Sequence, residues 1–469
     1  MWRGKFVYPP VDRSTNSIRL LQFRVDQPED DGIYCALQTY DIAVAPEFVA
    51  LSYTWGQPKP AYKIILNGVK FRVGENLWYA LRELQKAAKS KKLGDSKQTI
   101  DLTNHFWIDA ICINQDDYLE RGHQVNMMKD IYSNAQCVVV SLGAGTRYSD
   151  LAMKTISGAI VFRESTLADN HLSMLLQYFI LPTPQSTLTD HQRSALSEHF
   201  GQSHEEVLTD QQLSALAHLF DRPYWRRLWV VQEFLLAKDL WILCGSRGTW
   251  WLDFYACVQI LKKRPVPTSF ALEKMLRHRS KRYANTDNIA STSQPLSTLM
   301  RAFHTANCQD PRDRIYGLLG LIEEAPLRAL KADYTISTAQ LYCRVLCQFR
   351  DAYPDTFRSE WIELSESLGI ALEVEREDRK LIYNVHQVVY SQGSGARPHR
   401  RLSRPPTSVI PILERHFGER IHKDVKYPQG VCDRVIKKLR KSPIWEYKYM
   451  YTLLETRLQE ELGLQSQRR

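Results

Sequence analysis

A strand–helix–strand unit between residues 106 and 143 limits the fold of this chain more than any other feature. The apolar run 106–113 predicts a buried strand, and residues 137–142 predict a second one. Between them, Asp116 or Asp117 is expected to open a helix whose inward residues are Val125, Met128, Ile131 and Tyr132. Two buried strands joined through a helix pair in parallel, with a right-handed crossover. The unit therefore predicts an α/β fold.

Short strands precede this unit. Residues 18–25 and 33–40 predict two strands around a polar turn, and residues 48–53 predict a third. Residues 63–73 predict a hairpin, because the pair Asn67-Gly68 suits a two-residue turn in which both positions have positive φ. The N-terminal part is thus expected to contribute a β-hairpin element to the sheet.

One helix and one loop complete this part of the prediction. Asn76 is expected to cap a helix, because Asn favours the N-cap position. The buried face of that helix would carry Leu77, Ala80, Leu81 and Leu84. Residues 86–103 are polar and predict a loop.

The expected α/β domain covers residues 1–255 and contains a helical insertion at about 144–222. Within the insertion, residues 188–200 and 208–220 are identical at 8 of 13 positions. Thr189 or Asp190 would cap a short helix in the first copy, and Thr209 or Asp210 in the second. Two copies are too few for a repeat architecture, so they indicate a local duplication.

A mainly helical region is expected at 256–390, followed by a basic linker and C-terminal segment at 391–469. Asp310 is predicted to be an N-cap with Pro311 at the first helical position, and residues 341–349 predict a further helix. Arg312, Asp313 and Arg314 would form surface ion pairs or close this helical part onto the α/β body.

Residues 392–406 have the composition of a linker. Of the net charge of +10, an excess of nine positive charges falls in residues 397–441, which hold 13 Lys/Arg and 4 Asp/Glu. This stretch has few interleaved aromatic residues, so nucleic acid is not the expected partner. The short helical patterns in 407–469 suggest a peripheral segment.

The nine cysteines form no CxxC pair, and Cys343 and Cys347 suit one helix face as well as a metal site. No metal or cofactor is therefore expected. Residues 1–10 lack a signal-peptide core, and no apolar stretch of about 18 residues predicts a membrane span. These features predict a reduced, soluble, cytoplasmic protein. Cys112 and His123 would allow a thiol nucleophile and base, but Cys112 lies in an apolar run typical of plain core.

Polar residues follow the predicted parallel strands, at the edge where such sheets bind ligands. If the strands are neighbours, these residues meet: Ser52, Tyr53, Thr54, Trp55, Gly56, Asp109, Asn114, Gln115, Asp116, Ser141, Gly143 and Gly145. Asp109 interrupts an apolar run, and a buried carboxylate is costly unless it is paired or hydrogen-bonded. Asp109 would therefore either accept backbone N–H groups or contact a ligand.

Glu233 stands in a helix predicted at 228–237 that is otherwise apolar except for Gln232. Trp225 and Trp229 would share its face, and burial against the indole rings would raise the pKa of the carboxyl. Such an acid suits acid–base chemistry or holding a cation. The structural alternative is a buried ion pair with Arg226 or another arginine.

Three blocks in fixed order, residues 48–56 (FVALSYTWG), 106–143 and 224–245, resemble the heterokaryon-incompatibility (HET) domain of filamentous fungi. The resemblance implies self/non-self recognition and regulated cell death. HET domains are in turn similar to TIR domains, which have a flavodoxin-like fold. The segment RLWVVQEF (227–234), downstream of VVVSLG, resembles the TIR element that carries a glutamate.

The resemblance to TIR domains nominates Glu233 as a catalytic residue for cleavage of NAD, which would be a substrate and not a cofactor. The residues at the strand ends, together with Trp229, then give the expected substrate-binding set: Ser52, Tyr53, Trp55, Gly56, Asp109, Asn114, Gln115, Gly143 and Trp229. Within that set, Tyr53 and Trp229 would stack on rings. The rival hypothesis is a non-enzymatic signalling module. Its partner would be an incompatibility protein or a second copy of the chain.

Overall fold

The computed structural model describes residues 6–24, 32–56, 62–94, 99–101, 103–161, 208–261, 270–284, 294–322, 324–352 and 359–374. The chain divides into two compact units, one of residues 1–309 with 315–323 and the other of residues 310–314 with 324–469. The first copy of the duplication (188–200), the linker (392–406) and the final segment (407–469) lie outside the described residues.

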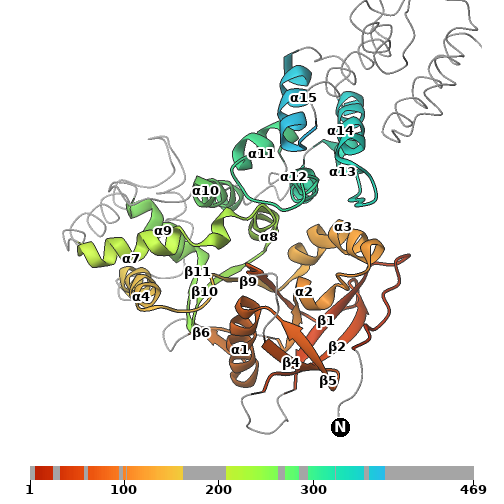
Figure 1. Cartoon of the computed structure of the whole chain (residues 1–469). Helices are drawn as coiled ribbons and strands as arrows, with labels where there is room; N and C mark the ends of the chain where they lie inside the picture. Colours follow the sequence, from red (N-terminus) through yellow and green to blue (C-terminus); the bar gives the residue numbers. More distant parts are fainter. Residues whose placement is uncertain are drawn as a thin grey trace, which may run out of the picture. The chain divides into compact units, whose positions relative to one another are not determined.

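The first unit is built on a nine-stranded sheet of described residues with the order β11-β10-β9-β3-β8-β1-β2-β4-β5 (Figure 1). Its strands are β1 (Ser17–Phe23), β2 (Tyr34–Asp41), β3 (Val49–Tyr53), β4 (Tyr62–Leu66), β5 (Val69–Val73), β8 (His105–Trp107), β9 (Cys137–Ser141), β10 (Leu240–Cys244) and β11 (Arg247–Trp250). Two further short strands, β6 (Lys92–Gly94) and β7 (Thr99–Asp101), pair with each other.

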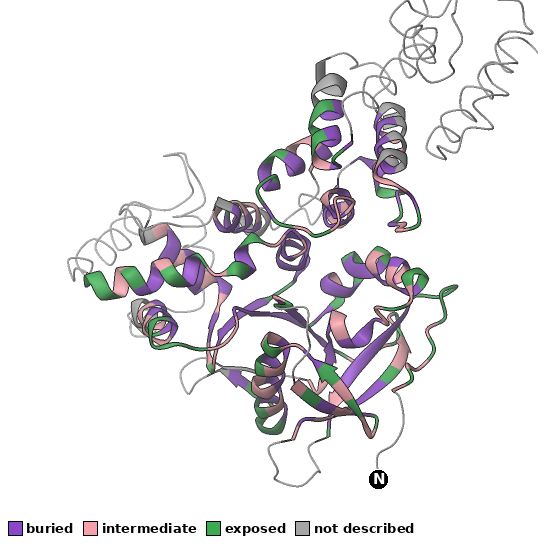
Figure 2. Cartoon of the chain, in the orientation of Figure 1, coloured by how far each residue is buried: buried purple, intermediate pink, exposed green. Residues whose placement is uncertain are grey.

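Four neighbouring strands, β8, β3, β9 and β10, are parallel. The predicted one-sheet arrangement of 48–53, 106–113 and 137–142 is therefore confirmed. Numbered along the chain, the parallel strands have the order 2-1-3-4, which is the flavodoxin-like order. Every residue of β3, β9 and β10 is buried, as expected for parallel strands covered on both faces (Figure 2).

The antiparallel half of the sheet follows its sequence signals. β1 pairs with β2 along its whole length, and β4 and β5 form the predicted hairpin. Its turn has φ of 47° at Asn67 and 77° at Gly68, as a tight two-residue turn requires.

Some local predictions were wrong. The run 106–113 is not one strand, because β8 ends at Trp107 and a short helix, α2 (Asp109–Cys112), follows. Asn76 is not an N-cap, because helix α1 (Glu75–Ser90) starts one residue earlier after Gly74. The segment 86–103 is not a plain loop, since it contains the end of α1 and strands β6 and β7.

Helix α3 (Tyr118–Asn134) is capped by Asp117, whose side chain accepts the N–H groups of Leu119 and Glu120. Its buried residues include Met128, Ile131 and Tyr132 as predicted, whereas Val125 is only half-buried. Helix α8 (Val230–Leu236) packs against α3, β3 and β9 (Figure 1). Helix α8, which carries Glu233, thus covers β3 and β9 together with its neighbour α3.

Other helices of this unit surround β10 and β11. Helices α4 (Arg147–Val161) and α9 (Trp251–Leu261) pack on these strands, and α7 (Asp210–Phe220) packs on α4. Thr209 caps α7 in a reciprocal capping box with Gln212, which confirms the helix predicted for the second copy. The remaining elements are η2 (Pro223–Arg226), α10 (Phe270–Ala284), α11 (Leu296–Phe303) and η4 (Leu319–Leu321).

The second unit contains α13 (Ala325–Arg328), α14 (Thr338–Ala352) and α15 (Ser359–Ala371), and α14 confirms the helix predicted at 341–349. Cys343 and Cys347 lie in α14, but their side chains are outside those described. Asp310 is not an N-cap, because α12 begins at Asp313 and ends at Tyr316. Arg312 instead pairs with Asp310 at 2.6 Å and donates to the carbonyls of Tyr334 and Ile336.

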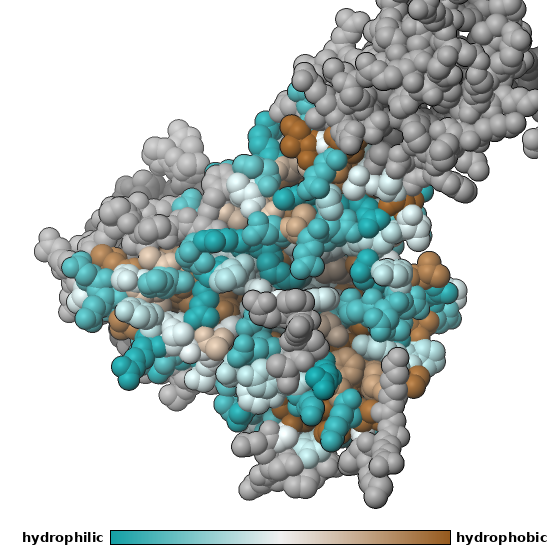
Figure 3. All heavy atoms as spheres, viewed as in Figure 1, coloured by the Kyte–Doolittle hydropathy of each residue, from teal (hydrophilic) through white to brown (hydrophobic). Residues whose placement is uncertain are grey.

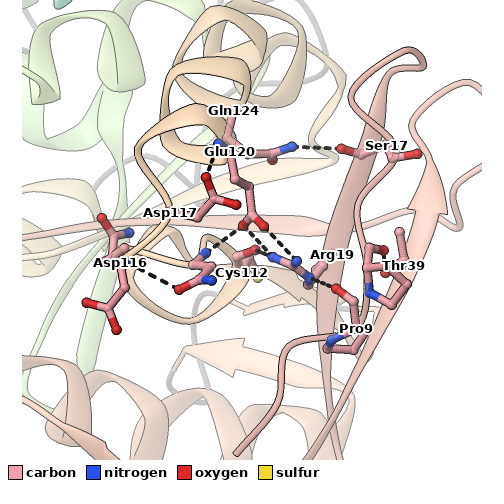
Figure 4. Close-up of polar contacts among 12 residues, drawn as sticks. Pro9, Ser17, Arg19, Thr39, Cys112, Asp116, Asp117, Glu120 and Gln124 are labelled. Carbon is pink, nitrogen blue, oxygen red and sulfur yellow. Dashed lines mark hydrogen bonds and ion pairs between the residues drawn. The ribbon is translucent and has the colours of Figure 1, made fainter. Parts of the chain in front are cut away.

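A buried ion pair joins β1 to α3 (Figure 4). The Arg19 guanidinium donates to both carboxylate oxygens of Glu120, at 2.6 and 2.9 Å, and also to the carbonyls of Pro9 and Cys112. Glu120 accepts a further bond from the N–H of Asn114 at 2.6 Å. Because both charges are removed from water, the pair depends on each partner being present.

We expect Arg19→Met to lower the free energy of unfolding by about 3–5 kcal/mol, since Glu120 would be left buried without a cation. The double variant Arg19→Met/Glu120→Leu should recover much of that loss. Urea denaturation followed by tryptophan fluorescence measures both. Lys86→Ala removes an exposed pair with Glu83 and is the control, with an expected cost below about 0.5 kcal/mol. A cost for Arg19→Met as small as the control's would contradict the expectation.

Candidate functional site

The carboxyl ends of β3, β8 and β9 share one edge of the sheet. Tyr53 at the end of β3 lies opposite Ser141 at the end of β9. Asp109 follows the end of β8 by two residues. The residues predicted from three separate segments are therefore brought to a common edge by parallel pairing.

Glu233 reaches this edge from α8 and contacts β3. Ser52 donates a hydrogen bond to the Glu233 carboxylate, and the Ser52 and Tyr224 hydroxyl oxygens are 2.7 Å apart. Ser52 is 0% exposed and Glu233 is 3% exposed. The buried hydroxyl of Ser52 in β3 thus meets the acid of an apolar helix, which satisfies both groups.

Of the arginines considered for Glu233, Arg226 or another, it is Arg227 and not Arg226 that acts on its carboxyl group. Arg226 is exposed and pairs with Asp221. Arg227 is half-buried, donates to the carbonyl of Tyr53, and interacts electrostatically with both Glu233 and Asp109. One guanidinium therefore faces two carboxyl groups.

Burial raises the pKa of Glu233 to about 7, with Arg227 opposing the rise and Asp109 adding to it. Burial also raises the pKa of Asp109, against Arg227 and the hydrogen bond from Trp55. Near neutral pH, Glu233 therefore exists in both protonation states and can give or take a proton.

Three buried tyrosines surround these charges. Burial raises the pKa of Tyr53, Tyr132 and Tyr224, and the negative charge of Glu233 acts in the same direction on each. Their hydroxyls therefore stay protonated and can serve as hydrogen-bond donors. Tyr224 was not predicted as a site residue, because its place beside Ser52 depends on the path of the chain between β9 and α8.

Asp109 is held at the more open part of the site. Trp55 donates its indole N–H to Asp109 at 2.8 Å, and Ala110 donates its N–H at 2.7 Å. Gln115 donates to the carbonyl of Asp109 at 3.1 Å. Trp55 is 42% exposed, so its ring offers a flat surface to a ligand.

The predicted stacking of Trp225 on Glu233 is wrong. Trp225 lies in η2 and not in α8, and its ring packs with Phe234 and Phe254. Trp229 is half-buried and precedes α8, and its carbonyl accepts from the N–H of Glu233. The helix predicted from residue 228 starts only at Val230, so the assumed face does not extend back to Trp225.

Asn114 belongs to the supporting structure of the site. Its N–H donates to Glu120, and its side chain accepts from the N–H of Asp116 at 3.3 Å. The Arg19–Glu120 pair thereby fixes the loop that carries Gln115 beside Asp109. Sequence reasoning missed this connection, because it joins residues about 100 positions apart.

Two interactions hold α8 in place. Gln232 accepts from the N–H of Gly320 at 3.2 Å, so the second polar residue of the helix has a separate partner from Glu233. Arg279 is 0% exposed and donates to the carbonyls of Phe234, Ala237 and Lys238 at the end of the helix. A cation at this end also complements the helix dipole. No local sequence signal marks Arg279 for this role.

The thiol alternative has no support from the geometry. Cys112 is fully buried, and burial raises the pKa of its thiol to about 12. Its sulfur lies against the N–H of Ile108 and the carbonyl of Phe106. Among the described residues, no group of three or more His, Cys, Asp or Glu side chains is placed to hold a metal ion.

In the part of the chain that the structure describes, no helix is both long and apolar enough to cross a membrane. No solved structure matches this chain. A protein of Neurospora crassa, described as heterokaryon incompatibility protein 6, OR allele, is 28% identical over 382 residues. The match covers 70% of this chain and 50% of that protein, so the chain spans about half the length of its curated relative.

The family model described as heterokaryon incompatibility protein (HET) matches residues 48–233. The matched region starts just before β3 and ends at Glu233, and it includes Ser52, Asp109 and Arg227. Residues 48–233 are therefore similar to the HET domain, and the cluster around Glu233 lies within this matched region.

Proposed function

We propose that this protein acts in heterokaryon incompatibility, where it triggers regulated cell death after self/non-self recognition. We further propose that its HET domain hydrolyses the nicotinamide–ribose bond of NAD or a related nucleotide. The observation that carries the chemical part is the Ser52–Glu233 pair, placed with Arg227 and Asp109 where parallel strands end. The name of the Neurospora relative supports the biological part.

In the proposed reaction, the ribose–nitrogen bond breaks and its electron pair leaves with nicotinamide. Water then attacks the ribose carbon and loses a proton, which yields ADP-ribose. The ionised Glu233 would stabilise the positive charge that develops on the ribose. Arg227 would keep part of the Glu233 population ionised, because it opposes the rise in pKa that burial causes.

A ring of the nucleotide would stack on Trp55 and not on Tyr53. Tyr53 is 3% exposed, whereas Trp55 is 42% exposed and is fixed by its bond to Asp109. Glu233 itself is closed off, so the proposed reaction needs a local opening that lets the ribose reach the carboxylate. Such an opening would link activity to recognition of a partner or a second copy.

The flavodoxin-like order of the parallel strands supports the TIR resemblance, which stays a prediction. The burial of Ser52 and Glu233 favours the rival function, a non-enzymatic signalling module. Self-assembly would then need an exposed surface. On the face that Figure 3 shows, hydrophilic residues dominate among the described atoms, and apolar ones are scattered.

At pH 5, where Glu233 is protonated, we expect Glu233→Gln to change the free energy of unfolding by less than about 1 kcal/mol, because the amide resembles the protonated acid that burial favours. NAD turnover and cell killing should fall by roughly 10²–10⁴-fold, since the amide carries no charge and transfers no proton. Chromatography of NAD after incubation with pure protein, a killing assay and thermal melting are the measurements.

Glu75→Gln is the matched control, because Glu75 is an exposed acid at the start of α1. It should leave turnover, killing and melting unchanged. A stable Glu233→Gln variant that kills as wild type does would refute the catalytic role. A variant that no longer folds would show that Glu233 is a structural group.

Stability and turnover should depend on pH in opposite directions. The pKa of Glu233 is about 7 in the folded protein and ordinarily 4.5, so the folded state binds this proton more tightly. The stability that Glu233 contributes is then fully present below about pH 4.5 and is lost as the pH rises through about 7. Turnover by the ionised form should rise over the same window.

Urea denaturation of wild type and Glu233→Gln at pH 5 and pH 8 tests this expectation. The wild type should lose about 1–3 kcal/mol more than the variant between the two pH values. Equal losses would mean that Glu233 does not titrate in this range. Turnover that falls with pH through 7 would assign the protonated form as the active one.

A further inference from the structure

The parallel strands reverse their order between β3 and β9. From β3 the chain leads to β8 on one side, and from β9 it leads to β10 on the other. In open α/β sheets, a crevice forms beyond the strand ends at this point, and ligands bind there. The residues at this crevice differ from those that hold Glu233.

Two glycines and one side-chain amide lie beyond these strand ends. Gly56 follows β3 with φ of 80°, and Gly143 follows β9 with φ of 97°. A methyl group on Gly56 would lie 2.9 Å from Asn76 Nδ2, and one on Gly143 would lie 3.9 Å from Asn76 Oδ1. Asn76 is anchored because it donates to the carbonyl of Thr54 at 3.0 Å. Bare backbone from both strand ends thus borders the same amide, which allows a ligand to approach closely.

Arg222 supplies a positive charge at the same place. Its Nη1 would lie 3.5 Å from a methyl group on Gly143, and it donates to the carbonyls of Leu142 at 2.9 Å and Ala144 at 3.0 Å. Among the described residues, these two bonds orient the guanidinium through one of its nitrogens. Arg222 is half-buried, and in the described part of the chain no carboxylate lies within ion-pair distance of it.

Asp150, in the first turn of α4, has a cationic partner other than Arg222. Asp150 lies beside Gly145 and pairs with Arg247 at 3.9 Å. On the β3 side, the Thr54 hydroxyl oxygen is buried and has no hydrogen-bond partner among the described residues. Among the described residues, these strand ends therefore present an oriented cation without a carboxylate partner, glycine backbone and a hydroxyl without a hydrogen-bond partner.

We infer that Arg222, Asn76 and the backbone at Gly56 and Gly143 form a subsite for the diphosphate group of a nucleotide. A guanidinium whose other two nitrogens have no hydrogen-bond partner among the described residues matches the oxygens of a phosphate in a bidentate manner. The inference rests on the proposed function and extends it, because it assigns the anionic part of the substrate to a place apart from Glu233. Arg222 is here a binding residue and takes no part in bond cleavage.

Calorimetric titration of the full chain with inorganic pyrophosphate, ADP and adenosine tests the subsite without requiring turnover. We expect Arg222→Gln to weaken pyrophosphate and ADP binding by roughly 10- to 100-fold, the loss typical of one charge-assisted contact. Arg222→Lys keeps the charge and should lose less. Adenosine carries no phosphate, so its binding should be the same in all variants. Binding of the two anions should weaken as salt is added.

Arg226→Gln is the matched control, because Arg226 is exposed and pairs with Asp221. It should bind pyrophosphate and ADP as wild type does. Equal affinity of wild type and Arg222→Gln for ADP would overturn the subsite, as would equal losses for ADP and adenosine. If Arg222→Gln fails to fold, Arg222→Lys decides instead: weaker pyrophosphate binding than that of Arg226→Gln supports the subsite, and equal binding by the two variants overturns it. No pyrophosphate binding by wild type overturns it.

The two proposals can fail separately. Arg222-dependent binding of ADP with no NAD turnover would retain the subsite and reject the hydrolase. NAD turnover that is unchanged in Arg222→Gln would retain the hydrolase and reject the subsite.

Discussion

The position of β3 between β8 and β9, parallel to both, is the constraint on which the rest of the site depends. Parallel pairing places three carboxyl ends at one edge, so residues from three distant segments become neighbours. The same burial on both faces excludes water from Ser52, the polar residue that β3 carries to α8. A shift of β3 by one residue would turn Ser52 away from Glu233.

Two carboxyl groups, Glu233 and Asp109, share one guanidinium, Arg227, and this imbalance gives the site its chemical character. Glu233 and Asp109 share the field of Arg227, which is too little to hold both fully ionised against burial. Arg279 and Gln232 hold α8 in place, so the helix does not shift to relieve the cost of burying Glu233. Arg279 donates to a carbonyl of α8, and Gln232 of α8 accepts the N–H of Gly320. A second cation, Arg222, stands at the neighbouring strand ends and is oriented by carbonyls. Glu233, an acid suited to the sugar, and Arg222, a cation suited to phosphate, thus lie at different places in the site.

Much of the architecture could be predicted from local patterns. The hairpin at Asn67, the cap at Asp117 and the parallel strands follow from turn chemistry, capping and apolar runs. Glu233 was identified because an acid in an apolar helix must meet something polar. Boundaries were less predictable: the run after Trp107 turns into α2, since apolar residues alone do not separate a buried strand from a short buried helix.

By itself, the sequence determined which residues are apolar, where the chain turns, and that Glu233, Asp109 and Ser52 would be buried acids or hydroxyls in need of partners. Only the tertiary structure decided which residues are their partners. Arg227 and not Arg226 faces Glu233, because η2 ends and the chain changes direction before α8 begins. Arg19 reaches Glu120, and Arg279 reaches the end of α8, across long stretches of chain. Such contacts carry no local signal, since they arise from packing of whole elements and not from the spacing of residues within one.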